Sequence, residues 1–236
     1  MKKITSLILP LLLLLSMPIC AHAHPDEKPM TSEQIESVLE TNILVKDYMT
    51  ELSPGSGTRA APKSQYLSVT PIQQSQTNYC GPASALMVTR YLSLVSSTYT
   101  QGQMATIIGT GGGGSSSDGI VTGLNALIQS HGYSFSYQVA NTSYASFSDS
   151  IIYTLDAAKP MILSAKQMPL YYSSSGHFIV LNGYYATGST ATTYRVQTVD
   201  IIDCHWNNAY YGNHNYTYAE MLEACNSNAG KFIRLS

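Results

Sequence analysis

Two apolar segments near the C-terminal end of the chain give the strongest strand signal. Residues 177–185 and 194–202 are rich in β-branched and aromatic side chains, and the polar segment 186–193 separates them. This pattern predicts an antiparallel hairpin. Shorter stretches, either apolar or alternating between apolar and polar side chains, predict further strands over residues 133–139, 160–165 and 231–235.

Apolar residues recur at helical spacing mainly before these strands. Ala83, Leu86, Met87 and Tyr91 share one face of a helix predicted over residues 80–94. The same reasoning predicts helices over residues 101–109, 119–131, 146–158 and 217–225. Helices and strands that follow one another in this order, with an antiparallel pair, indicate an α+β fold.

The N-terminal segment has the pattern of a secretory signal peptide over residues 1–23. Lys2 and Lys3 precede the apolar run 8–15, and Ala21-His22-Ala23 forms an A-x-A cleavage site. The apolar run is too short to span about 30 Å of hydrocarbon. The sequence therefore predicts an exported protein, extracellular or periplasmic, with no membrane segment after cleavage.

Residues 24–53 predict an amphipathic helix, and residues 54–64 predict a linker. Thr31 and Gln34 have the spacing of a capping box, and a Pro-Gly-Ser-Gly sequence follows the helix. Residues 24–63 hold seven acidic and four basic side chains. Two interpretations stay open: a docking helix or spacer, and a removable inhibitory pro-segment ahead of one domain over residues 65–236.

Charge is sparse along the whole chain. The 236 residues include 12 Lys and Arg against 14 Asp and Glu, which gives a formal net charge of −2. A nucleic-acid-binding protein usually has a basic excess, so this class is not favoured. The glycine-rich segment 109–119 lacks the Gly-Lys-Ser/Thr ending of a phosphate-binding loop. We expect a monomer without a cofactor or a metal ion.

Three cysteines remain after signal cleavage, which removes Cys20. An exported compartment is oxidising and favours disulfides. Cys204 and Cys225 are close in the chain, so we predict a disulfide between them that leaves Cys80 free. The alternative is three buried thiols.

Cys80 begins the helix predicted over residues 80–94. The unpaired N–H groups and the partial positive charge of a helix N-terminus favour a thiolate. Position alone does not separate a nucleophile from a structural cysteine. Gln74, six residues earlier, has an amide that suits an oxyanion donor, although a solvated loop residue is the simpler interpretation.

A histidine and two acids follow at strand ends. His177 begins the first hairpin strand, which suits a base of fixed geometry but also a structural histidine. Asp203 and Asp200 lie at the end of the second strand and point to opposite faces, so only one of them can orient the imidazole. We favour Asp203. His205 and His214 with Cys204 match no standard zinc spacing.

Together these motifs resemble the peptidase C39-like domains, which are papain-like cysteine peptidases. The resemblance spans about residues 66–236 and rests on Gln74-x5-Cys80-Gly81-Pro82-Ala83, on Gly176-His177 with Gly183-Tyr184, and on Ile201-Ile202-Asp203. It implies a nucleophile helix packed on a small antiparallel sheet. It also implies that Cys80 is the nucleophile, His177 the base, Asp203 the orienting acid and Gln74 the oxyanion donor, acting on a peptide or protein substrate.

The chain departs from the family pattern in two respects. Cys204 follows Asp203 where the family often has proline, which keeps Asp200 open as the acid. Family members fused to ABC transporters cut leader peptides, but this chain has no transporter segments. A non-catalytic binding module on the same fold, and an amidase or acyltransferase that uses the same thiol, remain alternatives.

Overall fold

A computed structural model of the chain describes residues 27–28, 60–132, 137–141, 144–188 and 194–235. The predicted signal peptide and the helix expected between Thr31 and Leu52 lie outside these residues. Residues 54–59 of the predicted linker also lie outside them.

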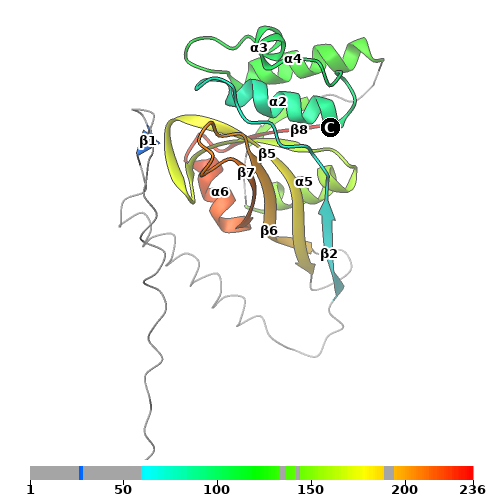
Figure 1. The fold of residues 1–236 in the computed structure, drawn as a ribbon. Helices are drawn as coiled ribbons and strands as arrows, with labels where there is room; N and C mark the ends of the chain where they lie inside the picture. Colours follow the sequence, from blue (N-terminus) through cyan, green and yellow to red (C-terminus); the bar gives the residue numbers. More distant parts are fainter. Residues whose placement is uncertain (1–26, 29–59, 133–136, 142–143, 189–193, 236) are drawn as a thin grey trace, which may run out of the picture.

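One antiparallel sheet organises the fold (Figure 1). Its strands follow the order β3-β8-β4-β5-β6-β7, and β1 and β2 also pair with β5. The 18-residue strand β5 is central, because its first part pairs with β4 and its second part lies between β2 and β6. The strands are β1 (Glu27–Lys28), β2 (Ala60–Tyr66), β3 (Tyr137–Asn141), β4 (Met161–Met168), β5 (Tyr171–Gly188), β6 (Tyr194–Asp203), β7 (Gly212–Thr217) and β8 (Lys231–Leu235).

The predicted hairpin is confirmed as β5 and β6, which pair from Val180 and Ile202 to Gly188 and Tyr194. The prediction of a linker over residues 54–64 is wrong for residues 60–64, which belong to β2 and pair with the end of β5. The Pro-Gly-Ser-Gly sequence suggested a linker that extends to residue 64, but the strand begins at Ala60. Pro62 is tolerated because it falls in the irregular part of the pairing between Ala60 and Lys63.

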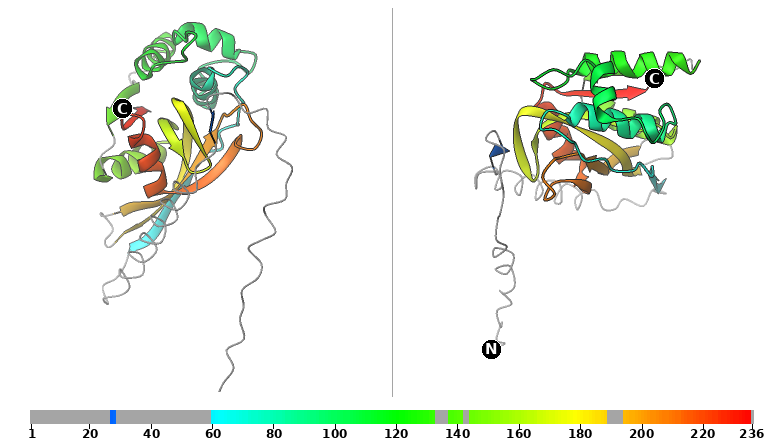
Figure 2. Two further views of the ribbon diagram at one scale, coloured as in Figure 1. Left: turned by 90° about the vertical axis from the view of Figure 1, so that its left-hand side faces the viewer. Right: turned by 45° about the horizontal axis from the view of Figure 1, so that its top comes forward.

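The described residues form five helices around the sheet: α2 (Cys80–Tyr91), α3 (Gln101–Ile107), α4 (Ser117–Ser130), α5 (Tyr144–Asp156) and α6 (Tyr218–Asn226). All five were predicted within a few residues. Helices α2, α3 and α4 form a group at one end of the molecule, and α2 packs against β5 (Figure 2). Helix α5 packs against β6, and helix α6 packs against β4. Among the described residues, no helix is long and apolar enough to cross a membrane.

The core lies on both faces of the central strands. Met161 to Ala165 are all buried, so side chains of β4 are covered on each side of the sheet. Phe147 of α5 packs on Phe232 of β8 and on Tyr218 of α6, with ring centroids 5.0 and 5.7 Å apart. The predicted α+β class, with the helix that begins at Cys80 packed on an antiparallel sheet, is confirmed.

The predicted Cys204–Cys225 disulfide is wrong: Cys80, Cys204 and Cys225 are all free thiols. Closeness in the chain suggested the bridge, but the fold directs the two side chains to different neighbours. Cys225 is inside α6, whereas the Cys204 thiol lies against the carbonyl oxygens of Phe178 and Cys80 at 3.3 and 3.6 Å.

Candidate active site

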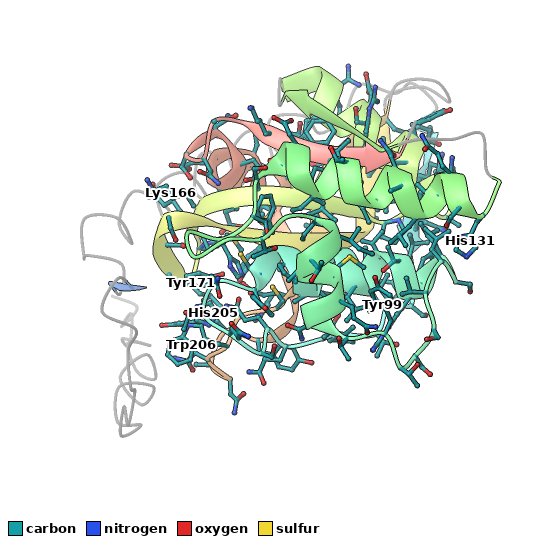
Figure 3. All side chains as sticks on the ribbon, turned by 90° about the horizontal axis from the view of Figure 1, so that it is seen from above. Tyr99, His131, Lys166, Tyr171, His205 and Trp206 are labelled. Atoms are coloured by element: carbon teal, nitrogen blue, oxygen red, sulfur yellow. The ribbon has the colours of Figure 1, made fainter. Side chains whose placement is uncertain are left out.

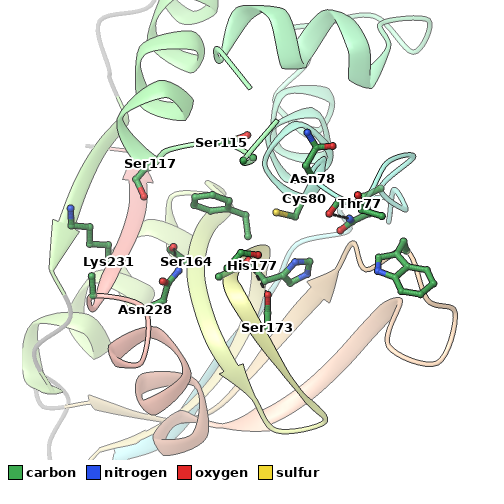
Figure 4. A pocket seen from close by; sticks show the side chains of 18 of the residues that line it. Thr77, Asn78, Cys80, Ser115, Ser117, Ser164, Ser173, His177, Asn228 and Lys231 are labelled. Carbon is green, nitrogen blue, oxygen red and sulfur yellow. Dashed lines mark hydrogen bonds between the residues drawn. The ribbon is translucent and has the colours of Figure 1, made fainter. Parts of the chain in front are cut away.

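The fold brings the four predicted site residues to one place. Cys80 is the first residue of α2, His177 lies in β5, and Asp203 ends β6. Gln74 precedes α2, and its backbone N–H donates to the Cys204 carbonyl at 2.7 Å. Cys80, His177 and Gln74 line a cavity of about 490 Å³ (Figure 4). Asp203 is not among the residues that line it and hydrogen bonds to His177.

The N-terminus of α2 differs from those of three other helices. Thr100, Ser116 and Thr217 cap α3, α4 and α6 with their side chains, whereas Tyr79 caps α2 without a side-chain hydrogen bond. The first turn of α2 also contains no acidic residue. The positive end of α2 is therefore left to the Cys80 thiol and to any anion beside it.

Glycine next to Cys80 allows a loop to approach the start of α2. A Cβ atom at Gly81 would lie 2.3 Å from Ser115 Oγ, a distance that real side chains do not allow. The buried Ser84, one turn further on, donates to the Phe178 carbonyl oxygen at 3.0 Å. These two contacts hold the helix start between the 111–115 loop and β5, directly beside His177.

Asp203, and not Asp200, is the acid beside His177. The His177 Nε2 atom lies 2.8 Å from Asp203 Oδ1, and both side chains are buried. Asp200 instead accepts a hydrogen bond from Asn215 on the neighbouring strand β7. Because Nε2 is occupied, His177 Nδ1 is the nitrogen left for a thiol.

Asp203 accepts hydrogen bonds from two further donors that no sequence pattern predicted. The Tyr171 hydroxyl donates to Oδ2 at 2.7 Å, and the His205 backbone N–H donates to Oδ1 at 2.9 Å. The Tyr171 ring lies edge-on to His205 and stacks on Tyr210. Tyr171, His205 and Trp206 gather at one end of the sheet (Figure 3). No motif marks Tyr171, because it lies outside every predicted element.

The electrostatics favour a charged pair of His177 and Cys80. Burial opposes ionisation of the Cys80 thiol, but His177 and the N–H groups of Phe178 and Gly81 outweigh it and lower the Cys80 pKa. Burial also opposes protonation of His177, but Asp203 and the neighbouring Cys204 side chain hold the His177 pKa well above its ordinary value. Burial would raise the Asp203 pKa, but His177 and Tyr171 lower it.

Two thiols lie within hydrogen-bonding reach of His177, and their surroundings differ. Cys80 is half-buried and faces the cavity. Cys204 is fully buried outside it, its neighbours are carbonyl oxygens that accept from S–H, and burial raises its pKa. Cys80 is therefore the thiol that can be both ionised and reached by a ligand.

Gln74 is buried beside Cys80, but its amide is already hydrogen bonded. Its Nε2 atom donates to the carbonyl oxygens of Gln76 and Thr77 at 2.8 and 3.0 Å. An oxyanion in the cavity would have to replace one of these acceptors. The backbone N–H at the uncapped start of α2 is the donor already in place.

The Gly176-His177 sequence has a structural cause. Gly176 has a φ of +85°, and a Cβ atom there would lie 2.5 Å from Asn228 Nδ2. Only glycine combines this backbone conformation with so close a neighbour. The residue therefore fixes how β5 enters the site immediately before His177.

A metal ion is a weaker interpretation of the same residues. His177, Asp203 and Cys204 offer ligand atoms within 4.8 Å of one another, a group of three that could hold a metal ion. However, His177 Nε2 already bonds Asp203, and the Cys204 thiol already lies against carbonyl oxygens. His205 Nδ1 accepts from the Asn207 N–H. These contacts fit a hydrogen-bonded triad better than a cation site.

Comparisons with known proteins give one family match and several similar solved structures. The Peptidase_C39 like family matches residues 66–226. Three solved structures are similar. One is a double glycine motif protease from an AMS/PCAT transporter in complex with a leader peptide, with 15% identity and a TM-score of 0.48 over 72% of this chain and 93% of that one. The peptidase domain of Streptococcus ComA, a bifunctional ABC transporter, has 18% identity and a TM-score of 0.47 over 71% and 98%.

The third structure is a C39-like peptidase from Bacillus anthracis, with 16% identity and a TM-score of 0.48 over 74% and 98% of the two chains. A comparison with curated proteins gives no match.

Proposed function

Because the chain belongs to the Peptidase_C39 like family, we propose that it is a secreted cysteine peptidase that hydrolyses peptide bonds through Cys80, His177 and Asp203. One observation carries the proposal: a half-buried thiol at an uncapped helix start lies beside a histidine whose other nitrogen is bonded to a buried carboxylate. A structural cysteine needs none of these three features.

The reaction follows from the charged pair. The Cys80 thiolate attacks the carbonyl carbon of the scissile bond, and the carbonyl electrons move to oxygen. The backbone N–H at the start of α2 stabilises this oxyanion, together with Gln74 once its amide exchanges one carbonyl acceptor for it. His177 then donates its proton to the amine that leaves, and a thioester remains on Cys80.

Water completes the cycle. Neutral His177 accepts a proton from a water molecule, and the resulting hydroxide adds to the thioester carbonyl. The acid is released, and Cys80 leaves as the thiolate with His177 protonated again. Asp203 holds the imidazole with Nε2 toward itself and Nδ1 toward Cys80 in both halves of the reaction. Asp203 stays ionised and takes up no proton in either half.

Cleavage of a mixture of proteome-derived peptides, followed by mass spectrometry, tests the proposal. The wild-type protein should produce new peptide ends that the Cys80→Ala variant does not produce. Cys225→Ala is the matched control, because Cys225 is a buried thiol in α6 away from the cavity. Equal products from wild type and Cys80→Ala would refute the proposal. Acyl transfer to added amines without new peptide ends would favour an acyltransferase, and binding without turnover would favour a binding module.

Export and processing are part of the same proposal. The signal pattern over residues 1–23 supports a protein that acts outside the cytoplasm. That it acts as a monomer is a further part of the proposal. For the acidic segment 24–63, we propose either an inhibitory pro-segment that is removed or a docking helix or spacer. Comparing the chain that begins at His24 with one that begins at Ala60, which keeps β2, tests this. Equal rates would exclude inhibition.

A further inference from the structure

The cavity extends beyond the catalytic pair to a second group of polar side chains (Figure 4). Lys231, Ser117, Ser164 and Asn228 lie at the end away from Cys80 and His177. We propose that this end binds a carboxylate of the substrate, which makes Lys231 a specificity-determining residue for an acidic side chain. The inference rests on the proposed peptidase function, because it concerns the substrate of the same cavity.

The described side chains that line the cavity include basic groups and no acidic group. Lys231 and His177 are the two basic side chains that line it, and no Asp or Glu is found among the described residues that do so. Lys231 is the first residue of β8 and is half-buried. In the part of the chain that the structure describes, no carboxylate forms an ion pair with Lys231.

The Lys231 side chain lines the cavity, and its ammonium group has no carboxylate partner among the described residues. A substrate carboxylate would provide the missing partner through charge-assisted hydrogen bonds. Because no acidic side chain lines the cavity, such a carboxylate would meet no like charge at its walls. A basic substrate side chain at the same place would be repelled by Lys231.

Ser164 supplies a second, neutral donor. Its side chain lines the cavity although the residue is only 6% exposed. The Ser164 oxygen accepts a hydrogen bond from Asn228 Nδ2 at 2.8 Å, so its own proton remains available to donate. A buried hydroxyl that lacks an acceptor is best satisfied by an oxygen of the ligand. Lys231 and Ser164 together can therefore bond a carboxylate. A neutral amide could accept a hydrogen bond from Ser164 but would not neutralise the charge of the Lys231 ammonium group.

Matched thiol-reactive peptides test this without requiring turnover. Each peptide carries a chloromethyl ketone, and a single Glu is moved one position at a time along it; a second series carries Gln in the same places. Cys80 should be alkylated by one Glu peptide about fivefold faster or more than by its Gln partner at low salt. The difference should shrink as the salt concentration rises.

Variants assign the preference to Lys231. The preference for Glu should disappear in Lys231→Gln and change to a preference for a Lys peptide in Lys231→Glu. Lys63→Gln is the matched control, because Lys63 lies in β2, pairs with Asp156 and is not among the residues that line the cavity. It should keep the wild-type preference.

The outcomes separate the two proposals. Fast labelling of Cys80 with equal rates for the Glu and Gln peptides at every position would overturn the carboxylate site and leave the peptidase proposal standing. If Cys80 labels no faster than a free thiol, the peptidase proposal fails. The carboxylate site is then decided by isothermal titration of Cys80→Ala with the same peptides lacking the reactive group. A Glu preference lost in the Cys80→Ala, Lys231→Gln double variant would support the site, and equal affinities would overturn it.

Discussion

The Tyr171 hydroxyl bonds the Asp203 carboxylate oxygen that His177 leaves free. Tyr171 donates to Oδ2 at 2.7 Å, and His177 Nε2 lies 2.8 Å from Oδ1. Asp203 is therefore held from two directions, and its carboxylate plane is fixed relative to the imidazole. Burial and the nearby carboxylate keep the Tyr171 pKa well above its ordinary value, so the phenol stays a donor.

Replacing Tyr171 by Phe should weaken this arrangement. A hydrogen bond to a charged group contributes about 1.5–3 kcal/mol, so we expect the free energy of unfolding to fall by about that amount. Asp203 stabilises the fold above its ordinary pKa, and this contribution is lost as the pH falls through its lowered pKa in the folded state. Without Tyr171 that pKa rises, and the midpoint of acid unfolding moves to higher pH.

Tyr210→Phe is the control for this experiment, because Tyr210 stacks on the Tyr171 ring with centroids 4.7 Å apart. Acid-unfolding curves followed by circular dichroism measure both variants. An equal shift of the midpoint in the two variants would mean that ring packing, and not the bond to Asp203, is responsible.

Exchanging Asp203 for Asn should separate its charge from its hydrogen bond. The amide oxygen can still accept from His177, but the negative charge is lost. Burial alone lowers the His177 pKa and Asp203 raises it, so the His177 pKa should fall in Asp203→Asn. The alkaline limb of the kcat/KM profile should move to lower pH, and kcat/KM near neutral pH should drop about tenfold or more.

Asp200→Asn is the matched control in the same strand, since Asp200 bonds Asn215 and not His177. Its pH profile should equal that of the wild type. A shift of the alkaline limb in Asp200→Asn, with none in Asp203→Asn, would mean that Asp200 and not Asp203 is the acid that orients His177.

Much of the site followed from the sequence because its residues lie at the ends of strongly patterned elements. Cys80 begins an apolar-faced helix, and His177 and Asp203 belong to two strands whose pairing the composition predicts. A hairpin brings its strands together whatever the rest of the fold does, so an acid of the second strand could be expected near His177 without tertiary information. The choice between Asp203 and Asp200 required the structure.

The parts that were missed depend on tertiary contacts. Strand β7 contains Gly212, Asn213 and Asn215, which disfavour strands, and it forms by pairing with β6. Tyr171 lies in the first part of β5, where no apolar alternation was recognised. The Cys204 thiol was expected in a disulfide, but the end of β6 turns it toward the start of α2. These positions are set by residues far away in the chain.

Gly176→Ala should destabilise the fold at the point where β5 enters the site, immediately before His177. The positive φ costs a non-glycine residue about 1–2 kcal/mol, and the added methyl group would also collide with the Asn228 amide. We expect the free energy of unfolding to fall by at least about 1 kcal/mol, measured by urea denaturation. Adding Asn228→Ala should restore part of the loss, because it removes the collision and leaves the backbone strain. Wild-type stability in Gly176→Ala would contradict this account.

The ionisation of Cys80 is the central claim, and alkylation by iodoacetamide over a range of pH measures it directly. The three thiols of the mature chain are read separately from one digest, with Cys204 and Cys225 as internal controls. Burial raises the Cys225 pKa to about 12 and raises the Cys204 pKa as well. We predict that Cys80 alone labels fast, with an apparent pKa below the free-thiol value of about 8.5, and that His177→Ala moves this pKa upward. Labelling of Cys80 that appears only near pH 8.5, or at the rate of Cys204, would contradict the proposed catalytic pair.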